Sequence, residues 1–225
     1  MNATQTNRTR AFTLIEMLMV IAIIAIVAGL VVGLAAVASP TKKINRAKTE
    51  LQKLVTLIEN YKSKVGVYPP DHPSNDDVNS LLYELAGAIR TNTPINDPIY
   101  GTVFGSIQSN ELWSTYGLTG IVNASDENGN PEDWQVKHFL KDLSPDQFAT
   151  VAGHLSLVVP VDGLNGKPNP WHYLRFDPND PNNLKRAKMH NPETFDLWVE
   201  IVIGHTNNGA GVSVPKTQTI GNWKN

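Results

Sequence analysis

The chemical group that stands out in the sequence is the carboxylate of Glu16, at the start of an uncharged apolar run from Met17 to Ala38. A helix over this run would be about 33 Å long, which matches the hydrocarbon core of a bilayer. A carboxylate at the start of a membrane helix is costly and is retained for a reason. The sequence therefore predicts one membrane helix whose acidic group has a specific function.

The segment that leads into the run contains a basic residue, a small residue and the string F-T-L-I-E, in the order Arg10-Ala11-Phe12-Thr13-Leu14-Ile15-Glu16. A short basic polar leader, a small residue, this string and an apolar helix resemble the processing site of type IV prepilins and type II secretion pseudopilins. The resemblance covers residues 10–38 and departs from the family at Ala11, where the family usually has Gly. The sequence offers no other evident use for the Glu16 carboxylate.

The resemblance implies two events at this site. A prepilin peptidase would cleave between Ala11 and Phe12, and the new amine of Phe12 would be methylated. In a filament, this cationic amine would meet Glu16 of a neighbouring subunit inside an apolar helix bundle, where attraction is stronger than in water and pairing offsets desolvation. The alternative for Glu16 is an interfacial position in contact with water.

Two other interpretations of the N-terminus are a cleaved signal peptide and a plain uncleaved anchor. A signal peptide has a shorter apolar region before its cleavage site, whereas the A-x-A-like Ala36–Ala38 follows the whole run. Arg8 and Arg10 precede the run, but basic residues from Lys42 to Lys48 follow it, so charge alone leaves the orientation open. The prepilin resemblance implies an inner-membrane protein with a cytoplasmic N-terminus and a periplasmic or extracytoplasmic C-terminal domain.

Beyond the run, apolar residues recur three or four positions apart, at Ile44, Ala47, Leu51, Leu54, Ile58, Tyr61 and Val65. This spacing places them on one face of a helix, here called the apolar stripe. We expect a nearly continuous helix from about Phe12 to Lys64 that ends at Gly66. The apolar stripe can be a coiled-coil seam or a face packed on the protein's own domain, and the folded-looking domain that follows favours the second.

Four segments are therefore expected along the chain. They are a leader peptide over residues 1–11, a transmembrane and polymerisation helix over 12–38, an amphipathic continuation over 39–66, and an extracytoplasmic globular pilin-like domain over 67–225.

Two further helices are expected in the globular domain. One covers about residues 77–90, with Asn75 or Asp76 as its N-cap. The other begins in the string from Ser144 to Gln147, which has the residues of an N-cap, an N1 proline and a capping-box glutamine, and it ends near Gly153.

Strands are expected mainly in the C-terminal part of the chain. Residues 92–135 are rich in turn formers and predict loops or short strands. Runs rich in Val, Ile, Trp and Tyr predict strands over Leu155–Val161, His172–Phe176 and Phe195–Ile203. Segments 162–173, 195–198 and 220–223 resemble the C-terminal sheet of major pseudopilins, with Trp171, Trp198 and Trp223 in its core. The predicted fold class is α+β, a long N-terminal helix with a membrane half and an amphipathic half, packed on a small antiparallel C-terminal sheet.

The composition and motifs of the chain argue against most kinds of catalytic, metal and nucleic-acid-binding site. The chain has no cysteine, so disulfides, zinc–thiolate sites and thiol nucleophiles are excluded. A net charge of −2 gives no large basic field for nucleic acid. The six histidines show no H-x-H or H-x-x-x-H spacing, and no nucleophile motif or phosphate loop is present. We expect neither an enzyme nor a metal site.

The family resemblance also raises the question of calcium. Major pseudopilins often bind calcium in the C-terminal loop through acidic side chains, because hard cations require several oxygen ligands. At the corresponding positions this chain has Thr206 or Asn207, and Thr219. A calcium site is therefore possible but disfavoured, and no cofactor is expected.

The function implied by the resemblance is structural. The chain would be a subunit of a type II secretion pseudopilus or a type IV pilus-like filament. Its partners would be a prepilin peptidase, identical or related pilin-like subunits, an inner-membrane assembly platform and the membrane itself, but not nucleic acid. The alternative is a signal-anchored extracytoplasmic binding module with no filament role, and an enzyme comes third.

Overall fold

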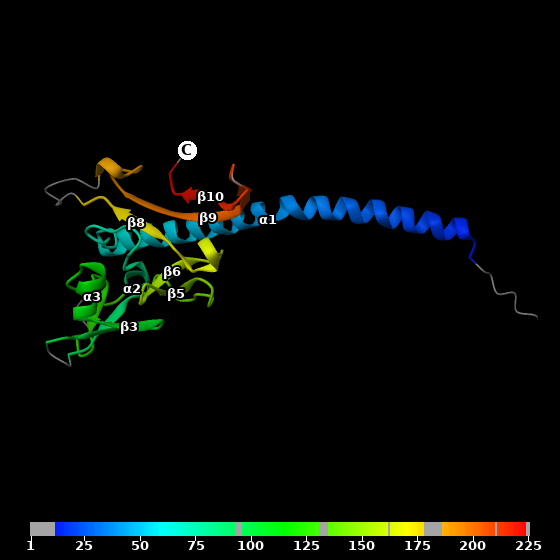
Figure 1. Cartoon of the computed structure of the whole chain (residues 1–225). Coiled ribbons are helices and arrows are strands. Elements are labelled where there is room, and N and C mark those ends of the chain that lie inside the picture. The colour runs from blue at the N-terminus through cyan, green and yellow to red at the C-terminus, as the bar shows by residue number, and fades with distance from the viewer. Residues whose placement is uncertain are drawn as a thin grey trace, which may run out of the picture. The chain divides into compact units, whose positions relative to one another are not determined.

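The computed structural model describes residues 12–92, 96–130, 135–161, 163–177, 186–209 and 211–223, without the side chains of residues 30–38 and 186. The chain divides into two compact units, Met1–Lys42 and Lys43–Asn225. Helix α1 (Leu14–Val65) passes from the first unit into the second and contains Pro40 (Figure 1). The long helix expected from about Phe12 to Lys64 is thus confirmed, while the predicted leader, residues 1–11, lies outside the described residues.

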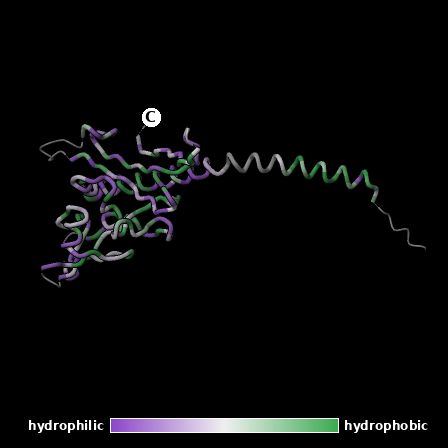
Figure 2. Tube along the Cα trace, viewed as in Figure 1, coloured by the Kyte–Doolittle hydropathy of each residue, from purple (hydrophilic) through white to green (hydrophobic). Residues whose placement is uncertain are grey.

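In the first unit, apolar side chains are exposed along the start of α1. Leu14 is 83 % exposed and Ile26 is 66 % exposed, and Figure 2 shows the first turns of α1 as apolar. Within the described part of the chain, no helix is long and apolar enough to cross a membrane. The span expected over residues 12–38 includes residues 30–38, whose side chains are not described, and it stays a prediction.

In the second unit, the apolar stripe of α1 is buried in the domain's own core. The stripe residues Ala47, Leu51, Leu54, Ile58 and Tyr61 are each at most 5 % exposed. Figure 1 shows this half of α1 between the β8–β10 strands on one side and α2, β5 and β6 on the other. The prediction that the stripe packs on its own domain is therefore confirmed.

Helix α1 ends where a left-handed backbone is required. Gly66 has a φ of +91°, and its N–H donates to the carbonyl of Lys62 at 2.9 Å. A glycine adopts this conformation without the strain that a side chain would add, so the predicted end at Gly66 is confirmed.

The remaining described elements are short. The helices are α2 (Leu81–Ala86), α3 (Ser109–Tyr116) and the 3-10 turns η1 (Leu164–Gly166) and η2 (Arg186–Lys188). The strands are β1 (Ala88–Arg90), β2 (Ile99–Thr102), β3 (Gly105–Gln108), β4 (Ala124–Asp126), β5 (Phe148–Val151), β6 (His154–Val159), β7 (Asn169–Pro170), β8 (His172–Arg175), β9 (Phe195–Asn207) and β10 (Ser213–Gly221). They form sheets with the orders β3-β2-β1-β4, β5-β6-β7 and β10-β9-β8, antiparallel except for the β1–β4 pair.

The β8–β10 sheet is completed by a side chain that follows β10. Asn222 exchanges bonds with Leu197 of β9: its N–H donates to the Leu197 carbonyl at 3.1 Å, and its Oδ1 accepts from the Leu197 N–H at 2.9 Å. Its Nδ2 also donates to the carbonyl of Phe195 at 2.9 Å. Asn222 therefore fixes the chain against β9 beyond the last strand pair. Trp171 is buried as expected, but Trp198 and Trp223 are only partly buried, so their placement in the core was wrong.

The helix expected over residues 77–90 is wrong except at Leu81–Ala86. Gly87 has a φ of +77°, and a Cβ there would collide with Val136. The close approach of a second chain segment thus requires a glycine and ends the helix. Residues 88–90 then pair with β2 and β4 instead.

The helix expected from Ser144 to Gly153 is also wrong. One of the capping-box bonds does form, since the Ser144 N–H donates to Oε1 of Gln147 at 2.8 Å. The chain then continues as β5, which pairs with β6 across a turn at Ala152 and Gly153. Both turn residues have positive φ, 51° and 91°, which is the backbone of a tight hairpin turn.

A buried carboxylate connects α1 to the rest of the domain. Glu84 of α2 has no exposed surface. It accepts the hydroxyl of Tyr61 at 2.7 Å and the backbone N–H groups of Val122 and Asn123 at 2.9 and 3.0 Å. Asn123 in turn accepts the N–H of Lys137 and donates to its carbonyl. Burial raises the pKa of Glu84, against the opposing effect of its hydrogen-bond donors.

Replacing Ile58 by Asp should strongly destabilise the domain. Ile58 is fully buried, and an unpaired carboxylate at this position should cost about 3 kcal/mol or more. The measurement is the thermal melt of the full chain in detergent, with Gln52→Asp on the exposed face of α1 as the control. If Ile58→Asp melts like the control, the apolar stripe is not the core of the domain.

Replacing Glu84 by Gln should destabilise the fold by about 1–3 kcal/mol, because the introduced amide must point an N–H at a donor. A raised folded pKa means that Glu84 contributes most below its unfolded pKa, about 4.3, and less as the pH rises through the folded pKa. The difference in free energy of unfolding between wild type and Glu84→Gln should therefore be largest in acid and smaller at higher pH.

This prediction is checked by urea unfolding at several pH values, with the exposed Glu127→Gln as the control. A gap that widens with pH would show that Glu84 is bound as an anion with a lowered pKa.

Candidate functional site: the start of helix α1

The residues predicted for processing and assembly lie around the first turn of α1. Ala11 is outside the described residues. Phe12 directly follows it and is 78 % exposed. Glu16 lies in the first turn of α1 and is also exposed.

Thr13 and Glu16 form a capping box at the helix start. The N–H of Thr13 donates to Oε2 of Glu16 at 2.8 Å, and the N–H of Glu16 donates to Oγ1 of Thr13 at 3.3 Å. The Thr13 hydroxyl also donates to Oε2 at 2.8 Å. Reciprocal bonds of this kind satisfy backbone donors that the helix leaves without partners. Glu16 therefore has a local use that our sequence analysis missed, although T-x-x-E before an apolar run is a known signal for it.

The capping box fixes how the carboxylate is presented. Both Thr13 donors reach Oε2, and no described residue donates to Oε1. The negative group also lies at the positive end of the helix dipole. The Glu16 carboxylate is thus held at the N-terminal end of α1, close in sequence to Phe12. Its Oε1 can accept a hydrogen bond from a further donor such as an amine.

The positions considered for calcium are not brought together. Thr206 of β9 lies opposite Val214, whereas Thr219 of β10 lies opposite Glu200. The two sites are separated by six positions along β9, about 20 Å of extended chain. One ion cannot contact both threonines, so the pair offers no shared calcium site.

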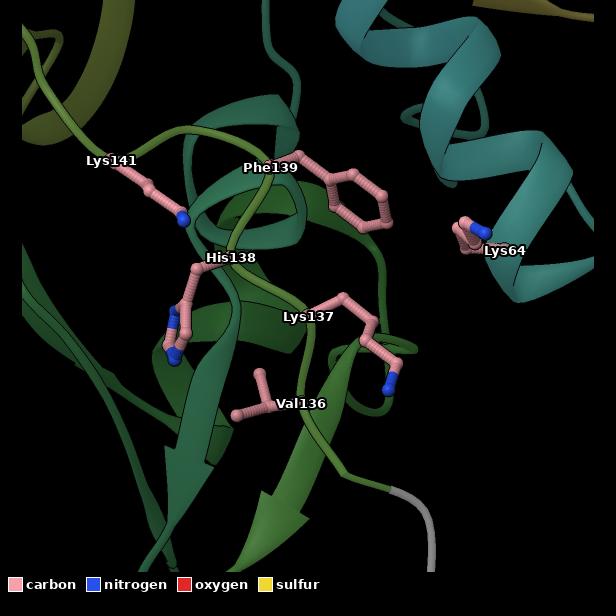
Figure 3. A pocket seen from close by; sticks show the side chains of 6 residues that line it. All are labelled: Lys64, Val136, Lys137, His138, Phe139 and Lys141. Atoms are coloured by element: carbon pink, nitrogen blue, oxygen red, sulfur yellow. The ribbon is translucent and has the colours of Figure 1, made fainter.

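A second candidate is a pocket of about 410 Å³ lined by Lys64, Val136, Lys137, His138, Phe139 and Lys141. Figure 3 shows that its cationic side chains point to different sides, with Lys64 and Lys137 on one side of Phe139 and Lys141 on the other. Phe139 packs against Tyr61 with ring centroids 5.4 Å apart. Because the charges do not converge, the pocket does not form an anion site.

Removing the Thr13 hydroxyl should loosen the start of α1. Thr13→Val keeps the shape of the side chain but loses both hydroxyl bonds, which should cost about 1 kcal/mol and make the Glu16 amide exchange with solvent about fivefold faster. Thr13→Ser should restore protection. The measurement is amide hydrogen exchange of the full chain in micelles. Equal exchange in Thr13→Val and wild type would show that the capping box does not hold the helix start.

Comparison with known proteins identifies this segment independently. Residues 6–32 match the family model described as the prokaryotic N-terminal methylation motif. No curated protein and no solved structure matches the chain. The matched residues include Phe12 and the Thr13–Glu16 capping box, so the predicted prepilin resemblance is confirmed, while the resemblance to major pseudopilins in particular is not. In its N-terminal segment, the chain is therefore similar to type IV prepilins.

Proposed function

We propose that this chain is a structural subunit of a pilus-like filament, either a type II secretion pseudopilus or a type IV pilus. The observation that carries the proposal is the first part of α1, where apolar side chains remain exposed on all sides of the helix. A helix of this kind is unstable in water and requires lipid or other apolar helices around it. A membrane before assembly and a helix bundle afterwards meet that requirement.

Glu16 supplies the polar contact that such a bundle needs for register. Its carboxylate is exposed, held by Thr13, and stands four residues after Phe12. Cleavage after Ala11 by a prepilin peptidase gives Phe12 a cationic amine, and the motif implies methylation of that amine. In a low-dielectric bundle, this amine pairs with Glu16 of the neighbouring subunit, since each charge alone would be costly there.

The proposal includes location and partners. The subunit sits in the inner membrane with its N-terminus in the cytoplasm, and its Lys43–Asn225 unit is extracytoplasmic. An inner-membrane assembly platform transfers it from the membrane into a filament of identical or related subunits. The chain itself performs no catalysis in this role and needs no cofactor.

Processing gives the first test. N-terminal sequencing of protein from its native host should begin at Phe12, with a methylated amine. A mature protein that begins at Met1, or after Ala38, would contradict the proposal.

Replacing Glu16 by Gln separates its two roles. Gln also completes a capping box, so the helix start should stay intact, but the charge is lost. A broken buried ion pair costs about 3–5 kcal/mol, which corresponds to about two to four orders of magnitude in incorporation. Cleavage, membrane fraction and filament incorporation are scored separately.

Thr13→Val is the matched control, because it weakens the capping box and keeps the charge. If Glu16→Gln enters the filament normally, the charge pair is not what assembles it, and a plain membrane anchor becomes the better account.

A further inference from the structure

A second group of chemically active side chains lies in the Lys43–Asn225 unit, where β8 begins. Asp76, Asp77 and His172 place a ligand atom each within 4.8 Å of one another. Nδ1 of His172 is 2.7 Å from Oδ1 of Asp77. The two segments are also joined by backbone, because the Tyr173 N–H donates to the carbonyl of Asp76 at 3.1 Å.

The charges of this group are not balanced by the protein around it. Two adjacent carboxylates repel each other unless a cation or a proton lies between them. Among the ion pairs of the described residues, Asp77 pairs only with His172, and Asp76 pairs with no Lys or Arg. A single imidazole therefore faces two carboxylates, and a divalent cation would balance them.

The imidazole is already oriented. The ring of His172 stacks on Trp198 of β9, with centroids 5.0 Å apart and planes 12° apart. Asp77 is held by its own turn, in which its N–H donates to Oδ1 of Asn75 at 3.0 Å. Ligands that are fixed before an ion arrives lose less entropy when it binds.

We propose that Asp76, Asp77 and His172 bind a divalent transition-metal ion, with Zn²⁺ as the expected occupant. One imidazole nitrogen with two carboxylates suits zinc, whereas calcium takes oxygen ligands only. With Zn–N and Zn–O bonds near 2.1 Å, atoms 2.7 Å apart subtend about 80° at the ion, so binding in tetrahedral geometry would separate them to about 3.4 Å.

The site departs from our expectation that the chain has no metal site, and it does not depend on the filament role. The spacing of histidines along the sequence does not indicate this site, because its ligands come from two distant segments. Three protein ligands leave a position for water or for a group from another molecule.

The chain contains an internal comparison. His190 also stacks on a tryptophan, Trp223, with centroids 3.9 Å apart, and its Nδ1 lies 3.4 Å from Oδ2 of Asp196. Asp196, however, already accepts the backbone N–H groups of His190 and Asn191. In the described part of the chain no second carboxylate joins this pair in a metal-binding group. His190 thus has a similar stacking partner and one neighbouring carboxylate without the proposed site.

The test is a calorimetric titration of the chelator-treated full chain, in detergent, with Zn²⁺. Wild type should bind one ion per chain. His172→Gln and Asp77→Asn should each weaken binding about tenfold or more, whereas His190→Gln should bind like wild type and Ca²⁺ should not compete. Circular dichroism confirms that each variant is folded.

A second readout does not need a ligand variant. Ni²⁺ bound beside the His172–Trp198 stack should quench tryptophan fluorescence, and the quenching should saturate at the same Ni²⁺ concentration as the heat in a calorimetric titration with Ni²⁺. The variant Trp198→Phe should lose most of that quenching but still bind the ion. No saturable Zn²⁺ binding by wild type, unchanged binding in a folded His172→Gln, or equal loss in His190→Gln would overturn the proposal.

Discussion

The Lys43–Asn225 unit depends on a carboxylate that has no contact with water. Glu84 accepts hydrogen bonds from a hydroxyl of α1 and from two backbone N–H groups of the segment before β4. Each donor would be unsatisfied without it, and an unsatisfied buried group costs more than a typical hydrogen bond contributes. The apolar stripe contributes one face of the core, but apolar contact is not directional. Glu84 and Tyr61 supply the direction, because the Tyr61 hydroxyl must point at the Glu84 carboxylate for its hydrogen bond to form.

Much of this architecture could be predicted from local patterns, and the two failures have different causes. Residues 44–65 keep one apolar period over many turns, and β9 carries a long run of strand formers, so both elements were predicted, although β9 continues to Asn207, beyond the predicted end at Ile203. The error at residues 77–90 arose where a distant segment decides the outcome, because Val136 approaches Gly87. The error at residues 144–153 arose at a hairpin: residues 148–151 pair with the next strand, β6, across a turn in which Ala152 has a positive φ. The residue type of Ala152 does not indicate that turn.

The candidate sites divide in the same way. Glu16 could be found because an apolar run follows it and because the string F-T-L-I-E carries a family resemblance, although its bonds to Thr13 were not predicted. The group at His172 could not, since its carboxylates lie in another part of the sequence. The contrast with His190 shows what a structure adds. Two histidines with similar stacking partners differ in whether the neighbouring carboxylate is already occupied, and that depends on bonds made by Asn191 and the backbone.

The hydrogen bonds between Asn222 and β9 come from the last part of the chain, and this has a consequence for biosynthesis. A ribosome makes the apolar stripe of α1 early, but β9, which shares its core, follows more than a hundred residues later, and β10 and Asn222, which bond to β9, come later still. The core therefore cannot close while most of the domain is being translated. During that interval the stripe is exposed and prone to aggregation, as is usual when contacts are distant in sequence. The strands made last, β9 and β10, then complete the core, so folding of the domain follows its synthesis.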